Sequence, residues 1–144
     1  MKNKDTINLL KECDAGSKMA VTSIDDVLGY VKNQEMLELL RETKDHHSEL
    51  GNDLHELLNQ YGSDEKEPSM MAKGMSHMKM SVKIGMDNCD STIADLIIEG
   101  CDMGIRSLYK YLHQYSEADK KACDIGKRLI SIEDELRRKM YKYL

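Results

Sequence analysis

The chain has 144 residues, of which 40% are hydrophobic and 33% charged, and its formal net charge is -5. This length suits one domain that can bury a core, and the composition is typical of a globular protein. The acidic balance argues against general nucleic-acid binding. No apolar run reaches the ~20 residues that a membrane span needs, and the start of the chain has no apolar block of signal-peptide type. We therefore expect one cytoplasmic domain, residues 1–144, without a nucleic-acid or membrane partner.

Helical periodicity occupies the first part of the chain. Apolar residues recur every three or four positions over residues 7–31 and again over residues 36–61. Asn33 can cap the second of these helices, and Gly62 can end it. Because only a few residues separate the two stretches, they predict an antiparallel helical hairpin over residues 5–61.

The connection over residues 62–90 begins as a polar loop up to Pro68. Apolar residues at helical spacing then predict a short helix over residues 69–86. The methionine-rich segment 70–86 allows two interpretations. Thioethers beside a histidine suit Cu(I), whereas methionines at helical spacing suit packing of this short helix on the bundle. The spacing favours packing.

A second helical hairpin is predicted over residues 91–143. Its two apolar stripes cover residues 94–115 and 118–140, and residues 116–119 look like a capping box between them. The sequence thus predicts an all-α four-helix bundle with a short helix in a long crossover. A helix of about 27 residues is about 40 Å long, and the connection can span that length. The second and third long helices should then run parallel. An up-down-up-down bundle with an appended flap is the alternative.

Three short stretches carry a resemblance to a known family: LLKECDAG at 9–16, PSMMAKGMSHMKMSVKI at 68–84 and LIIEGCDMG at 96–104. The chain resembles the ferritin-like superfamily, and looks most like an uncharacterised bacterial family of small ferritin-like four-helix bundles. The resemblance implies a single-crossover bundle. Di-iron members use two Glu-x-x-His pairs, and no Glu-x-x-His occurs in this sequence. The resemblance therefore implies the fold rather than a di-iron centre.

Four polar residues interrupt the apolar stripes of the first hairpin: Asp14, Ser17, Thr43 and His47. They form either a hydrogen-bonded network that fixes helix pairing or a metal or small-ligand site. Counting ~1.5 Å per residue from the turn between the helices places His47 near Ser17 and away from Asp14. The network is the favoured interpretation.

A metal site would need further donors from the second hairpin. Asp102 and Glu133 lie beside the apolar stripes near mid-bundle. The candidate metal ligands are therefore His47, Asp102 and Glu133, for iron or another transition metal. The four cysteines contain no Cys-x-x-Cys pair and are expected to be reduced thiols. Cys101, on the core stripe, is expected to act as a small hydrophobe.

Two functional hypotheses remain from the sequence. No nucleophilic triad, phosphate loop or dinucleotide fingerprint is present, so catalytic and cofactor-binding residues are not assigned. The favoured hypothesis is a non-catalytic ferritin-like protein that acts through self-association or partner binding. The alternative is a metal-binding storage or redox protein with a reduced ligand set. The C-terminal half of the third long helix is apolar on more than one stripe, so either the short methionine-rich helix or a second chain should cover Tyr109. Because that helix is short and should leave part of this surface exposed, we expect a homodimer with Tyr109 at its interface.

Overall fold

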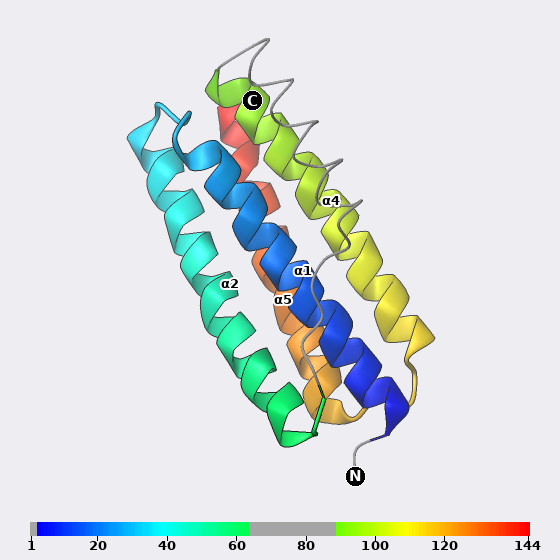
Figure 1. The fold of residues 1–144 in the computed structure, drawn as a ribbon. Helices are drawn as coiled ribbons and strands as arrows, with labels where there is room; N and C mark the ends of the chain where they lie inside the picture. The colour runs from blue at the N-terminus through cyan, green and yellow to red at the C-terminus, as the bar shows by residue number, and fades with distance from the viewer. Residues whose placement is uncertain (1–2, 64–88) are drawn as a thin grey trace.

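The computed structural model describes residues 3–63 and 89–144, and in these residues it contains helices and no strand (Figure 1). The elements are α1 (Lys4–Leu28), α2 (Gln34–Gln60), α4 (Asp90–Gln114) and α5 (Lys120–Met140), followed by the short 3-10 helix η1 (Tyr141–Tyr143). The prediction of an all-α bundle with four long helices is confirmed. The predicted short helix at 69–86 and the methionine-rich segment 70–86 lie outside the described residues.

Side-chain caps explain where three of the helices begin. The N-caps Asn3, Asn33 and Asp119 each accept a hydrogen bond from the backbone N–H three residues later, which satisfies one of the orphan donors of a helix start. The Asn33 cap is as predicted. The predicted capping box at 116–119 is wrong in its position, because its last residue, Asp119, is the cap. Gly62 follows α2 with a φ of 68°, a left-handed conformation that favours glycine.

Contacts between the helix ends fix the topology. The Asp90 carboxylate at the start of α4 accepts hydrogen bonds from the backbone N–H groups of Lys32 and Asn33, both at 2.8 Å. At the opposite end, the backbone N–H of Asp119 donates to Thr6 Oγ1 at 2.8 Å. Thus α2 and α4 begin at the same end and run parallel, as the long connection predicts (Figure 1). The up-down-up-down alternative is wrong.

In the bundle, α1 and α5 each contact the other three long helices. Contacts are most extensive within the pairs α1–α2 and α4–α5, and α1 and α5 also contact each other. The core falls into two apolar clusters. One surrounds Met36, Leu40 and Ile97 near the starts of α2 and α4, and the other surrounds Leu9 and Leu54 near their ends. A layer of buried polar residues lies between these clusters at mid-bundle, and it is the natural place to look for a site.

Candidate functional site

The mid-bundle polar layer consists of four side chains that the sequence placed on apolar stripes and of Glu133, which it placed beside one. Its members come from α1, α2 and α5, and each is less than a tenth exposed: Asp14, Ser17, Thr43, His47 and Glu133. The four polar residues that interrupt the apolar stripes of the first hairpin are therefore buried, as predicted. Burying such groups is costly unless they find partners, so their contacts show what the layer does.

The shortest contact in the layer joins α2 to α5. His47 Nε2 lies 2.8 Å from Glu133 Oε1. The two side chains are 1% and 11% exposed, so the contact is shielded from water. Its distance is that of a strong polar interaction, but the ring N–H is not aligned with the carboxylate oxygen, and neither ring nitrogen makes a well-directed hydrogen bond within the described part of the chain. His47 is therefore held beside Glu133 by close packing in the core and by this polar contact.

Glu133 also lies beside a third helix, because its carboxylate is close to the Cys101 thiol on α4. Burial, followed by the negative charge of Glu133, raises the pKa of Cys101 well above its usual range. A side chain at Gly104 would place its Cβ 3.9 Å from Glu133 Oε2, so the glycine leaves room beside the carboxylate. Through Glu133, the layer connects α2, α4 and α5.

On α1, Ser17 completes the layer. Its Oγ donates a 2.9 Å hydrogen bond to the backbone carbonyl of His47, at the depth that helix geometry predicts. Asp14 instead pairs with Lys18 one turn along its own helix, at 3.1 Å, and Thr43 donates to the carbonyl of Leu39 at 2.9 Å. The seam is therefore not one continuous network. Its connected part contains Ser17, His47, Glu133 and Cys101.

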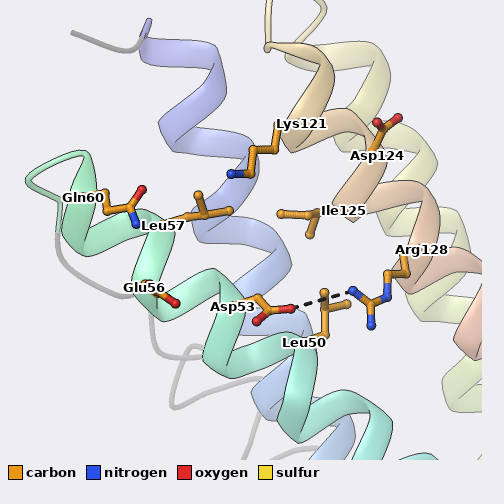
Figure 2. Close-up of a pocket in the computed structure, with 9 residues that line it drawn as sticks. All are labelled: Leu50, Asp53, Glu56, Leu57, Gln60, Lys121, Asp124, Ile125 and Arg128. Carbon is orange, nitrogen blue, oxygen red and sulfur yellow. Dashed lines mark ion pairs between the residues drawn. The ribbon is translucent and has the colours of Figure 1, made fainter.

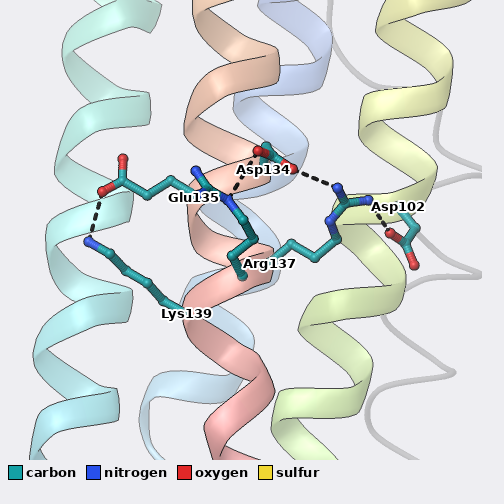
Figure 3. Close-up of polar contacts among 6 residues, drawn as sticks. Asp102, Asp134, Glu135, Arg137 and Lys139 are labelled. Carbon is teal, nitrogen blue, oxygen red and sulfur yellow. Dashed lines mark hydrogen bonds and ion pairs between the residues drawn. The ribbon is translucent and has the colours of Figure 1, made fainter.

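Asp102, the third predicted metal ligand, lies apart from this layer. Its carboxylate accepts a 2.8 Å hydrogen bond from Arg137 Nη1, and Arg137 Nη2 donates to Asp134 at 2.6 Å (Figure 3). The Asp102 side chain is 49% exposed. The structure thus brings His47 and Glu133 together and holds Asp102 in a separate ion pair. Among the described residues, no three His, Cys, Asp or Glu side chains are arranged to hold a metal ion. Metal binding by His47, Asp102 and Glu133 stays a prediction.

Sequence reasoning missed two members of these contacts. Arg137 was not among the candidate residues, although its position one turn after Glu133 could have suggested that it reaches α4. Cys101 was interpreted as a small hydrophobe, and it does lie in the core, but it also lies beside Glu133. No sequence motif marks that contact.

A second feature is a surface groove between α2 and α5, with a volume of about 390 Å³ (Figure 2). Its floor is apolar, with Leu50, Leu57 and Ile125. Its rims are charged, with Asp53 on α2 and Arg128 on α5 joined by a 3.8 Å ion pair. The groove opens to solvent and does not reach the buried polar layer, so the two features are separate.

The four cysteines differ in a way that alkylation can measure. Cys13 and Cys101 are buried, whereas Cys89 and Cys123 are partly exposed. Burial raises the pKa of Cys13 to about 12, so at pH 8 its thiolate should be about a thousandfold scarcer than in the unfolded chain. We expect iodoacetamide to label Cys89 and Cys123 in the folded protein and all four thiols in urea. Fast labelling of Cys13 in the folded protein would contradict its burial.

The raised pKa of Cys13 also makes the stability of the folded protein depend on pH. The folded state holds this proton more tightly than the unfolded state, whose thiol has a pKa of 9.0. The contribution to stability is therefore complete below about pH 9 and is lost as the pH rises toward about 12.

No protein-family model, curated protein or solved structure matches this chain. No helix in residues 3–63 and 89–144 is long and apolar enough to cross a membrane. The ferritin-like resemblance therefore has no support from these comparisons.

Proposed function

We propose that this chain is a non-catalytic, cytoplasmic helical-bundle protein that acts through self-association or by binding a partner. The observation that carries the proposal is that the polar layer joins the four helices to one another. Ser17 bonds the backbone of His47, the His47 ring lies against Glu133, and Glu133 lies beside Cys101, so successive contacts run through all four helices. This is the pattern of a network that specifies helix pairing. It leaves the exposed faces of the helices as the surfaces through which such a protein works.

The ferritin-like relation stays part of this proposal. Parallel α2 and α4, each antiparallel to its hairpin partner, are the arrangement of single-crossover bundles. The relation rests on this topology and on the short sequence stretches.

Sedimentation of the full chain at micromolar concentration tests the self-association arm. We expect a dimer, and a strict monomer would count against it. Tyr109 on α4 is the interface residue that the sequence predicts. Its side chain is 51% exposed, so Tyr109→Glu can test this prediction without disturbing the core. Loss of the dimer in Tyr109→Glu would place the contact on α4.

The alternative function, transition-metal binding, is favoured by one observation. A histidine nitrogen on α2 lies 2.8 Å from a carboxylate oxygen on α5, in the pair His47 and Glu133, and such donors suit zinc or iron. Elemental analysis of protein made without an affinity tag separates the two functions. We expect no stoichiometric metal. Bound metal that is lost in Glu133→Gln but retained in the matched control Asp102→Asn would favour the alternative and would remove Asp102 from the ligand set.

A further inference from the structure

One face of α2 is acidic along its whole length. Acidic residues recur every three or four positions, so they share one side of the helix, and all of them are exposed: Glu38, Glu42, Asp45, Glu49, Asp53 and Glu56. Glu35 extends the series to the first turn of the helix. Asp53 pairs with Arg128 and Glu35 pairs with Lys142. The acidic side of α2 is therefore turned toward the α5 edge of the bundle.

The neighbouring side of α5 is partly apolar and mixed in charge, with more basic residues than acidic ones; Asp124 is one of the acidic residues that line the groove. Lys121 and Arg128 line the groove beside Ile125, which is partly buried (Figure 2). Farther along, Glu135 and Lys139 project toward α2 and pair with each other at 2.8 Å (Figure 3). The α2–α5 face thus presents an acidic column on one helix and a predominantly basic column on the other.

The two columns are in register. Arg128 meets Asp53 in the half of the face where α2 ends, and Lys142 meets Glu35 at the opposite end. Between them, Lys139 has a raised pKa, mainly because of Glu135 and also because of Glu42 on α2. Opposite charges therefore lie at matching heights at three places along the face. The Arg128–Asp53 pair is long, at 3.8 Å, and both side chains are more than half exposed, so each can take a second partner.

We propose that the α2–α5 face binds the same face of a second copy of this chain, about a twofold axis parallel to the helices. Such an axis places α2 of one copy opposite α5 of the other at the same height. Asp53 of each copy then faces Arg128 of the other, which makes a box of four alternating charges. A twofold axis perpendicular to the helices would instead place α2 against α2, acid against acid. Charge complementarity therefore selects both the partner and the orientation.

The face is large enough for a stable contact. Two neighbouring helices of 27 and 21 residues span a surface about 30 Å by about 20 Å. This approaches the ~800 Å² per partner of standard interfaces. The apolar floor of the groove, with Leu57 and Ile125, offers surface that a second copy can remove from water. The inference rests on the proposed self-association and names its surface.

Charge reversal tests the inference in a way that folding defects cannot imitate. In the full chain, Asp53→Arg and Arg128→Asp should each weaken the dimer at least about tenfold, because like charges then face each other twice across the axis. Mixing the two variants should restore association, since the introduced arginine of one chain would meet the introduced aspartate of the other. The double variant Asp53→Arg/Arg128→Asp should also form a dimer. Sedimentation at ~0.05 M salt measures all four samples, because low salt preserves exposed charge pairs.

Matched controls separate this inference from the proposed function. Lys127→Glu reverses a charge at an exposed position of the same helix that does not line the groove, and it should leave the dimer intact. If the wild type is a dimer that ignores both charge reversals but dissociates in Tyr109→Glu, the α2–α5 interface is wrong and self-association stands. A wild type that is monomeric at low salt overturns both the interface and self-association, and leaves partner binding as the proposed function. Failure of the mixed variants to associate would also overturn the interface.

Discussion

Replacing His47 by leucine is expected to lower the free energy of unfolding by about 2–4 kcal/mol, because removing one member of a buried polar pair strands the other. Glu133 would remain buried, 8% exposed, with only the Cys101 thiol as a described partner at its carboxylate. The loss of packing should be small, since leucine fills a similar volume. Urea unfolding of the full chain, followed by circular dichroism, measures the change.

The paired variant His47→Leu/Glu133→Leu distinguishes a stranded charge from general damage. Replacing both members of a buried pair by apolar residues is often neutral or stabilising, so the double variant should recover at least half of the loss. Asp102→Ala is the matched control, because it removes a carboxylate that is half exposed, and it should cost less than about 1 kcal/mol. If His47→Leu were as stable as the wild type, Glu133 would have to find water or another partner, and the layer would not specify helix pairing.

The fold follows from features that are local in the sequence. Helical spacing of apolar residues marks each long helix, since a stripe of this kind can be buried only if the chain is helical. The parallel arrangement of α2 and α4 follows from the length of the connection. The position of the cap before α5 was harder to predict. Both Ser116 and Asp119 are of residue types that favour the cap position. Asp119 takes it, and its backbone N–H also donates to Thr6 on α1, a contact that no local pattern shows.

The site could be predicted only in part, for a physical reason. The depth of His47 and Ser17 along their helices follows from ~1.5 Å per residue, so their proximity was predictable. Which carboxylate meets His47 depends on helix rotation and on competing cations. Glu133 lies on the buried side of α5, whereas Arg137 holds Asp102 near the surface. When candidate ligands are chosen only by their depth along the helices, the pairing of Asp102 with Arg137 is not taken into account.

Leu54→Ala is expected to have the other large effect, lowering the free energy of unfolding by about 2–5 kcal/mol. Leu54 is completely buried in the apolar cluster near the end of α2, where four well-packed helices leave little freedom to close a cavity. Leu37→Ala on the same helix is the matched control. Leu37 is only partly buried, so its truncation should cost less than about 1.5 kcal/mol.

Leu54→Ala, compared with Leu40→Ala, also tests whether the polar layer couples the two apolar clusters. Leu40→Ala creates a cavity in the other cluster, about 21 Å along α2 from Leu54. If the bundle unfolds as one cooperative unit, both variants should shift the urea midpoint while the slope of the transition stays unchanged. A second, separate transition in Leu54→Ala alone would show that the half containing Leu9 and Leu54 can unfold by itself. In that case the contacts of Ser17, His47 and Glu133 would be too weak to hold the two halves together.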